Sequence, residues 1–388
     1  MVSGSLCSQP SADSSLFSFS QSENISNLRS KYIENCKAIY IEFCKDKIYR
    51  VRSTYFIYKA KQKGSDIVTQ TSKIILEKYQ VRKSGKQKRD FRDYLKAVAL
   101  NGGYEYKEEK SMGACNVVIG NPDTAKVVYT AHYDTCAVLP FPNFITPKNF
   151  LIYLLYQFLI VFALFGAISI VSFLLIKAPM IFIKNEEIQY EIAWLIFPLW
   201  QILLWVSVFW MVGLGMANKH TANDNTSGVT TLIDIMNALP DEQKNNVAFV
   251  FFDLEEVGLV GSMRFKAKHR KSMKNKLLIN FDCVSDGENM LFAIKRKAKK
   301  YLPYMEEAFK DTESVKVNLA TRGVFYPSDQ ASFPCGVGVA AMKKTKLLGI
   351  MYMNRIHTPR DTVYREENIA YLTQGSVKLV EILSKENQ

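Results

Sequence analysis

Two long apolar runs constrain the fold of this chain more than any other feature of its sequence. Residues 150–176 and 192–216 each extend past 20 residues without a charged side chain. About 20 helical residues are enough to cross a bilayer hydrocarbon core of ~30 Å. The runs therefore predict a transmembrane helical hairpin over residues 148–217, with the lipid bilayer as a partner.

Composition limits the remaining possibilities only broadly. The 388 residues are 48% hydrophobic, which suits a soluble domain joined to a membrane part. A formal net charge of +13 suits nucleic acid, anionic lipid or acidic substrates alike. We find no nucleic-acid-binding motif and expect no nucleic acid partner. The seven cysteines contain no C-x-x-C pair, which favours free thiols in a reducing compartment.

The N-terminal part carries no signal peptide pattern. Residues 1–26 are rich in serine and are predicted to be a disordered tail. Residues 27–64 are predicted to be an amphipathic helical segment, either packed on the soluble domain or lying on the membrane surface. Basic runs such as residues 82–89 are expected to be solvated or to face lipid headgroups.

The orientation in the membrane follows from the chain before the hairpin. Lysines flanking the hairpin and lysines in its connecting loop balance each other, so the local charge count does not decide. The predicted hairpin is preceded by 147 residues without a signal. We therefore expect an integral membrane protein whose soluble domain lies in the cytoplasm.

The soluble domain is predicted to comprise residues 65–147 and 218–388. Runs at 127–131, 247–252 and 276–281 are short and almost continuously apolar, which is typical of strands covered on both faces. Val229, Leu232, Ile233 and Met236 follow the stripe of a helix that Pro240 ends. This alternation predicts an α/β layered domain, in which ligands bind at the carboxyl edge of the sheet.

Polar residues that suit a metal site follow these predicted strands or lie on the next loop. Two imidazoles with several carboxylates and no thiolate form a ligand set for zinc, cobalt or manganese. Two such ions ~3.5–4 Å apart need a shared carboxylate and further ligands on each side. The candidates are His132 in AHYDT, Asp224 in ANDNTSG, Glu255 and Glu256 in FFDLEEVGLVGS, Asp282 in NFDCVSDG, and His357 in IHTPRDT.

The spacing of these residues suggests roles. Side chains at adjacent positions point in different directions, so one of Glu255 and Glu256 can bind metal while the other acts as general base. Asp134, two residues after His132, can orient that imidazole and raise its basicity.

Each candidate also has an ordinary explanation when taken alone. Isolated loop histidines and a Glu-Glu pair at a solvated helix start are common, and Asp224 could be a helix N-cap in competition with Asn225. Cys136 and Cys283 lie near the candidates in sequence. We leave both out, because Cys283 is expected to point away if Asp282 ends a strand.

The ordered motifs AHYDT, ANDNTSG, FVFFDLEEVGLVGS, LLINFDCVSDG, SDQASF and HTPRDT resemble those of the M28 family of zinc aminopeptidases. The resemblance covers roughly residues 87–384 apart from the hairpin. It implies a three-layer α/β sandwich with a mostly parallel mixed sheet between helices. It also implies two zinc ions: His132 and Asp282 on one, Glu256 and His357 on the other, Asp224 between them, Glu255 as general base and Asp134 orienting His132.

Three departures from the family pattern stand out. Ile356 occupies the place of a tyrosine that stabilises the oxyanion in many members, so zinc or Tyr326 would have to do so. Gln330 replaces the histidine of an S-D-H motif and is expected to alter a substrate-pocket position. The 92 positions between His132 and Asp224 hold the hairpin where the family has a short loop.

The function expected from the resemblance is that of a membrane-anchored di-zinc metallopeptidase. It would be an aminopeptidase acting on peptides with a free N-terminus, through a metal-bridged hydroxide with Glu255 as general base. One alternative is a glutaminyl-cyclase-like transferase, since such enzymes share the fold but work with one zinc. Another is a receptor or scaffold that kept the fold without the chemistry. Side-chain preference and oligomeric state stay open.

Overall fold

The computed structural model describes residues 66–139 and 141–386 of the chain. The predicted disordered tail at 1–26 and the predicted helical segment at 27–64 lie outside the described residues.

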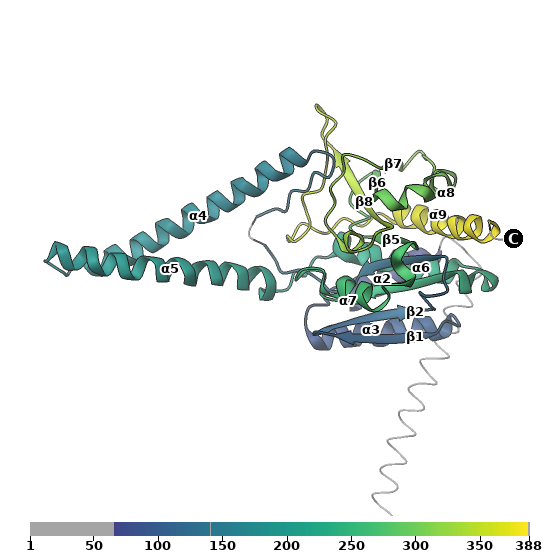
Figure 1. Ribbon diagram of the computed structural model, residues 1–388, viewed down its shortest axis with the longest axis horizontal. Coiled ribbons are helices and arrows are strands. Elements are labelled where there is room, and N and C mark those ends of the chain that lie inside the picture. The colour runs from purple at the N-terminus through teal and green to yellow at the C-terminus, as the bar shows by residue number, and fades with distance from the viewer. Residues whose placement is uncertain (1–65, 140, 387–388) are drawn as a thin grey trace, which may run out of the picture. The chain divides into compact units, whose positions relative to one another are not determined.

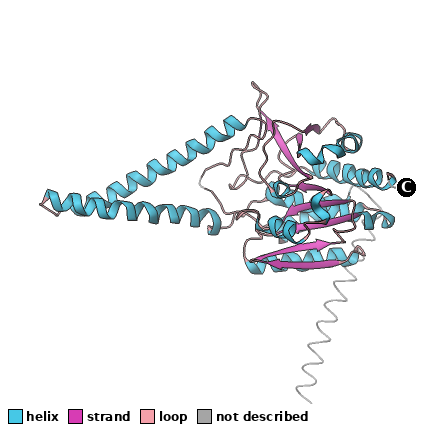
Figure 2. Ribbon diagram, viewed as in Figure 1, coloured by secondary structure: helices cyan, strands magenta, loops and turns pink. Residues whose placement is uncertain are grey.

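A nine-stranded mixed sheet forms the centre of the described α/β part (Figures 1 and 2). Its strands follow the order β1-β2-β4-β3-β5-β8-β6-β7, and β9 pairs with β8. The pairs β4–β3, β3–β5 and β5–β8 are parallel, and the outer pairs β1–β2, β2–β4 and β6–β8 are antiparallel. The strands are β1 (Tyr106–Ser111), β2 (Ala114–Ile119), β3 (Val127–His132), β4 (Val247–Phe252), β5 (Leu277–Phe281), β6 (Asn289–Ile294), β7 (Lys316–Ala320), β8 (Gly336–Lys344) and β9 (Met351–Tyr352).

The three predicted strands are confirmed as β3, β4 and β5. Every residue of these strands is buried, because helices or loops cover both faces of the sheet. Burying one large apolar side chain stabilises the fold by about 1.5–3 kcal/mol. Continuous apolar strands of this kind therefore belong in the middle of a layered domain.

Helices cover the sheet on both sides and complete the three layers, which confirms the predicted fold class. One large buried cluster joins alternate strand residues to α2, α3, α6, α8 and α9, and a smaller cluster joins the opposite strand residues to α7. These helices are α2 (Asp66–Lys78), α3 (Gly85–Asn101), α6 (Gly228–Ala238), α7 (Val260–Lys268), α8 (Leu302–Ala308) and α9 (Glu366–Lys385). The predicted apolar stripe of α6 is buried, and Pro240 follows its end.

Two long apolar helices interrupt the domain between β3 and α6. They are α4 (Phe150–Met180) and α5 (Glu186–Leu214), and in Figure 1 neither covers a face of the sheet. Each is longer than the apolar run that predicted it. Helix α5 begins early because the Asn185 side chain accepts hydrogen bonds from the backbone N–H groups of Glu187 and Ile188. The two helices contact each other through the rings of Phe165 and Trp205.

Both ends of the hairpin are tied to the α/β part. At the start of α4, the rings of Phe150 and Tyr153 contact Phe325, which lies between β7 and β8. After α5, Ala217 forms a β-bridge with Ala137, a few residues beyond β3. The hairpin therefore starts beside the loop between β7 and β8 and returns beside the segment that follows β3.

Candidate metal centre

The predicted metal ligands converge at the carboxyl edge of the sheet. Strands β3, β4 and β5 run parallel, so the residues that follow them meet at one edge. Two further residues reach the same place from loops before α6 and before α9. The set consists of His132 at the end of β3, Glu255 and Glu256 after β4, Asp282 after β5, Asp224 in the turn Ala222–Ser227 (η1), and His357 between β9 and α9.

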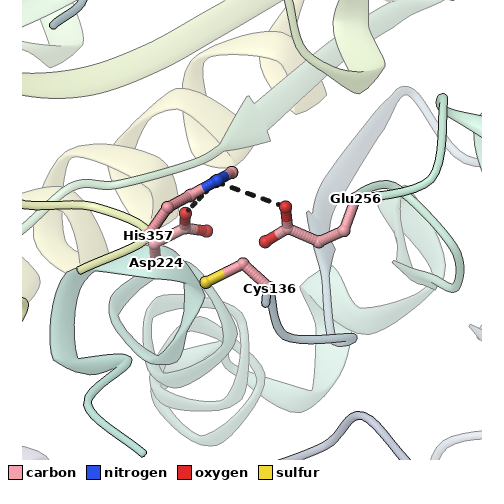
Figure 3. Close-up of side chains that lie close together, drawn as sticks. All are labelled: Cys136, Asp224, Glu256 and His357. Atoms are coloured by element: carbon pink, nitrogen blue, oxygen red, sulfur yellow. Dashed lines mark ion pairs between the residues drawn. The ribbon is translucent and has the colours of Figure 1, made fainter. Parts of the chain in front are cut away.

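Asp224 lies between the two histidines. Its Oδ1 is 3.3 Å from Nε2 of His132, and its Oδ2 is 3.0 Å from Nε2 of His357. His132 Nε2 also lies 3.4 Å from Oδ1 of Asp282. On the other side, His357 Nε2 lies 3.3 Å from Oε2 of Glu256 (Figure 3). One carboxylate therefore faces two separate histidine and carboxylate pairs, which is the arrangement that a bridging ligand requires.

Three overlapping groups of side chains have ligand atoms close enough to hold a cation. Within each group, these atoms lie within 4.8 Å of one another. Two of the groups share Asp224, and the third contains both adjacent glutamates. The groups are His132, Asp224 and Asp282; Cys136, Asp224, Glu256 and His357; and His132, Glu255 and Glu256.

Asp134 lies beside His132, as expected, and it also contacts the turn of the two glutamates. Its carboxylate oxygens accept hydrogen bonds from the backbone N–H groups of Glu255, at 3.1 Å, and Glu256, at 3.3 Å. Nδ1 of His132 lies 3.1 Å from the backbone carbonyl of Asp134 and 3.6 Å from its carboxylate. Asp134 thus fixes the turn that carries the two glutamates, while its backbone orients the imidazole.

The loop of Asp224 is held by residues that sequence reasoning did not single out. The Asp361 carboxylate accepts hydrogen bonds from the backbone N–H groups of Asn223 and Asp224, at 2.9 and 3.0 Å. Asn225, and not Asp224, caps the start of α6, since its Oδ1 accepts from the N–H of Gly228. The N-cap explanation for Asp224 is therefore wrong. Asp361 could have been found only as the acidic residue of the IHTPRDT motif.

A buried arginine lies below this edge, contrary to the expected solvent exposure of residues 82–89. Arg82 is fully buried, and its guanidinium donates hydrogen bonds to the backbone carbonyls of Tyr79 and Tyr133. It also donates to the hydroxyl of Thr226 at 3.2 Å. Burial lowers the pKa of Arg82 to about 10, against the opposing effect of Asp134. Even at that pKa the side chain stays charged near neutral pH, and it offsets part of the acidic charge above it.

The electrostatics of the centre fit a bound metal cation. Burial raises the pKa of Glu255 well above its ordinary value and that of Glu256 to about 8. Burial lowers the pKa of His357, but Glu256 and Asp224 raise it to a net value of about 9. These shifts express an excess of buried negative charge that a divalent cation would neutralise. Oε1 of Glu256 is buried and has no hydrogen-bond partner among the described residues, so it is available as a ligand.

Both cysteines left out of the predicted site lie at it. The expectation that Cys283 points away is wrong: its thiol donates to Oδ1 of Asp282 at 3.1 Å. The backbone at Cys283 has a φ of 60°, in the left-handed region, and this turn brings the thiol back to the preceding carboxylate. Cys136 joins the group of Asp224, Glu256 and His357 (Figure 3).

The departures from the family pattern have structural explanations. The hydroxyl of Tyr326 donates to the backbone carbonyl of Asp282 at 3.0 Å, so Tyr326 supports that ligand. Ile356 is buried with Tyr326 in a small apolar cluster. Gln330 is also buried, and its amide bonds to Asn280 and to the carbonyl of Tyr326. Gln330 thus links parts of the protein interior, and its effect on a substrate pocket stays a prediction.

Left-handed backbone is concentrated around the centre. Leu254, Cys283 and His357 are among the few described residues other than glycine with positive φ, at 57°, 60° and 60°. Each of them is itself part of the centre or lies next to one of its residues in the chain. Such conformations cost of order 1–3 kcal/mol each and collect at functional sites. The sequence gives no pattern that would reveal them.

Comparisons with known proteins agree with the fold. Residues 210–378 match the family model described as peptidase family M28, while no curated protein matches the chain. The LapA aminopeptidase of Legionella pneumophila is 15% identical with a TM-score of 0.47, over 85% of this chain and 72% of that one. A glutaminyl cyclase of Porphyromonas gingivalis is 13% identical with a TM-score of 0.50, over 82% and 98%. A leucine aminopeptidase precursor of Bacteroides thetaiotaomicron is 12% identical with a TM-score of 0.45, over 81% and 96%.

The family match confirms the resemblance drawn from the motifs. At these identities a solved structure shows the fold alone, and of the three the glutaminyl cyclase, with a TM-score of 0.50, supports it. The matched segment begins after His132 and Asp134. The place of these two residues in the site therefore rests on the geometry described above.

Proposed function

We propose that this chain, whose residues 210–378 match peptidase family M28, is a membrane-anchored metallopeptidase with two zinc ions. The proposed reaction is removal of the N-terminal residue from peptides, which makes the chain an aminopeptidase. Cobalt or manganese would suit the histidine and carboxylate ligands as well.

The position of Asp224 carries the proposal. Its two oxygens face different histidines, at 3.3 and 3.0 Å, and each histidine faces one further carboxylate. A site for a single cation would need only one of these two histidine and carboxylate pairs. Two divalent ions that share a carboxylate are the usual arrangement in aminopeptidases and related hydrolases.

The side chains divide the chemical work as follows. His132 and Asp282 would complete one metal site, and Glu256 and His357 the other. Bound ions polarise the scissile carbonyl and make the attacking water more acidic. The Glu255 carboxylate accepts the proton of that water and passes it to the nitrogen of the leaving amine. The Asp134 carboxylate accepts a hydrogen bond from the backbone N–H of Glu255 and so keeps Glu255 in place.

The hairpin supports the membrane part of the proposal. Its apolar side chains are largely exposed, for example Trp194 at 82%, and both helices are long and apolar enough to cross a bilayer. Leu347 and Leu348, in the turn between β8 and β9, are also exposed, at 92% and 72%. Leu348 lines a hollow together with Lys148, which precedes α4. Lysines beside exposed leucines suit the interface of an anionic membrane. We keep the cytoplasm as the predicted side for the α/β part.

A glutaminyl cyclase is the main alternative. It shares the fold, and it needs only one metal site. The second group around Glu256 and His357 favours the two-metal peptidase, because a one-metal enzyme would leave these buried groups without a cation.

The test uses the full chain purified in detergent and loaded with zinc. A panel contains one peptide with a free N-terminus, its N-acetylated form, and a peptide that begins with glutamine. The proposal predicts release of the first residue from the peptides with a free N-terminus but not from the N-acetylated form, and hydrolysis that depends on Glu255. Cyclisation of the glutamine peptide without hydrolysis would favour the alternative. No reaction with any peptide, in a chain that binds no metal, would favour a scaffold.

A further inference from the structure

A cysteine lies within reach of one half of the centre. Cys136 follows β3 by four positions and is 1% exposed. Its Sγ lies within 4.8 Å of ligand atoms of Asp224, Glu256 and His357, which are themselves within that distance of one another. Figure 3 shows the sulfur and the Glu256 carboxylate pointing into the space next to Asp224 and the His357 ring.

Two independent features indicate that this space takes a cation. The Glu256 side chain is only 9% exposed, and its Oε1 has no hydrogen-bond partner among the described residues. The Asn218 amide points its Nδ2 at the Cys136 sulfur at 3.8 Å, which makes the sulfur an acceptor. A sulfur that accepts a hydrogen bond, beside a carboxylate with one oxygen free to bind a cation, suits a metal-bound thiolate.

We propose that Cys136 is a fourth protein ligand of the metal ion held by Asp224, Glu256 and His357. This proposal rests on the metal dependence in the proposed function. A tetrahedral zinc ion with ligand bonds of roughly 2.0–2.3 Å has its ligand atoms roughly 3.3–3.8 Å apart. His357 Nε2 already lies 3.0 Å from Asp224 and 3.3 Å from Glu256, and all four ligand atoms lie within 4.8 Å of one another, so only small side-chain movements are needed. Binding releases the thiol proton, since only the thiolate is a ligand.

A sulfur ligand would make the two halves of the centre unequal. Four protein ligands fill a tetrahedral ion, whereas the group of His132, Asp224 and Asp282 leaves a position open for water or substrate. The thiolate also selects zinc, cobalt or cadmium against magnesium and calcium. The site with Cys136 would thus keep its ion firmly, and the site with Asp282 would face the substrate.

The hairpin holds this cysteine in place. The backbone N–H of Asn218 donates to the carbonyl of Cys136 at 3.1 Å, and the N–H of Val138 donates to the carbonyl of Met216 at 2.9 Å. The chain that returns from α5 therefore pairs with the segment that carries the sulfur. This contact explains how an insertion of this size adds a ligand without disturbing the other residues of the centre.

Zinc X-ray absorption on the full chain in detergent tests the proposal. A zinc–sulfur distance at ~2.3 Å is separable from nitrogen and oxygen ligands at ~2.0–2.2 Å. We expect about half a sulfur per zinc in the wild type, because one of two ions carries it. Cys136→Ser should remove the sulfur contribution and release one zinc on dialysis against a chelator. Cys335→Ser is the matched control, since Cys335 is equally buried but precedes β8 at the opposite edge of the sheet.

The outcomes separate this proposal from the proposed function. Zinc bound without a sulfur contribution would overturn the cysteine ligand and leave the metal site intact. A sulfur contribution that survives in Cys136→Ser and is lost in Cys283→Ser would show that Cys283, and not Cys136, is the ligand. That result would overturn the proposal. Absence of bound zinc would overturn both. Should Cys136→Ser fold poorly, cobalt-loaded wild type still decides, because a thiolate ligand produces a charge-transfer band that nitrogen and oxygen ligands do not.

Discussion

The α/β part and the hairpin contain the same kinds of apolar residue in opposite environments. Phe249 and Phe251 in β4 are fully buried, whereas Phe162 in α4 and Phe209 in α5 are 69% and 73% exposed. The first pair is covered by other elements of the same chain. The second pair has no such cover among the described residues, and the two helices that carry it are long and apolar enough to cross a bilayer. Apolar content alone therefore does not separate a core from a membrane span.

Charged side chains also lie in different environments in the two regions. Charged residues are buried at the edge of the sheet, where several of them face a histidine or a backbone N–H. In the hairpin, Glu186, Glu187 and Lys177 lie near the helix ends, and the long stretches between them carry no charge. The comparison predicts that changes at the sheet edge affect chemistry strongly, while changes on the hairpin surface affect neither chemistry nor folding of the α/β part.

The largest effect is expected from Asp224→Ala. The variant removes the carboxylate that both halves of the centre share, so hydrolysis should fall to background. Circular dichroism should show an unchanged fold, because Asn225 and not Asp224 caps α6. Retention of more than a tenth of wild-type activity would show that Asp224 does not bridge the centre.

Glu255→Gln should lower kcat by ~10²–10⁴-fold while metal content stays the same. The amide cannot accept the proton of the attacking water, but it keeps the volume of the side chain. Glu306→Gln, on the exposed surface of α8, is the control and should match the wild type. Loss of zinc from Glu255→Gln, with zinc kept in Glu256→Gln, would mean that the two glutamates have exchanged roles.

Two phenylalanine variants compare the regions directly. Phe249→Ala should lower the free energy of unfolding by ~3–5 kcal/mol, because it leaves a cavity in the sheet core. Phe162→Ala should change it by less than about 0.5 kcal/mol in detergent, since the ring contacts only its own hairpin and solvent. Equal losses in thermal or denaturant unfolding would remove the distinction between core and span.

Replacing residues 150–214 by a flexible linker of about 20 Gly and Ser residues should yield a soluble protein that still binds metal. Residues 216–218 must stay, because they pair with the segment of Cys136. Hydrolysis of short polar peptides should stay within about threefold of the wild type. A linker variant that folds but binds no metal would show that the hairpin does more than anchor the chain.

The smallest expected effect lies on the water-facing surface of the α/β part. Hydrogen bonding to Glu109 raises the pKa of His269, so the charged pair contributes stability fully below the unfolded pKa of 6.5. That contribution disappears as the pH rises through the folded pKa. His269→Gln should therefore lower the free energy of unfolding by about 1 kcal/mol in mild acid and by nothing in alkaline solution. A deficit that is the same at both pH values would contradict the ion pair.

The sequence predicted the elements whose signature is local. Strands β3 to β5, the buried stripe of α6 and the two apolar helices all follow from periodicity or length, and each ligand candidate follows a strand or lies in a motif. We expected the ligand candidates to converge because the strands before them were predicted to be parallel, and in the structure these strands are parallel. The resemblance to family M28 supplied the pairing of ligands, which periodicity could not.

The remaining features depend on contacts between distant segments. Arg82 belongs to a basic run, yet it is buried because the carbonyl of Tyr133 and the hydroxyl of Thr226, both distant in sequence, accept its hydrogen bonds. Asp134 bonds to the turn of Glu255, more than a hundred residues away. Cys136 joins the centre because the chain after α5 returns beside it. None of these contacts follows from the spacing of residues along the chain.

The number of zinc ions retained by the purified full-length chain tests the central claim most directly. The account predicts two ions per chain in the wild type, one in Glu256→Ala and none in Asp224→Ala. A single ion in the wild type that is unaffected by Glu256→Ala would contradict a two-metal centre bridged by Asp224.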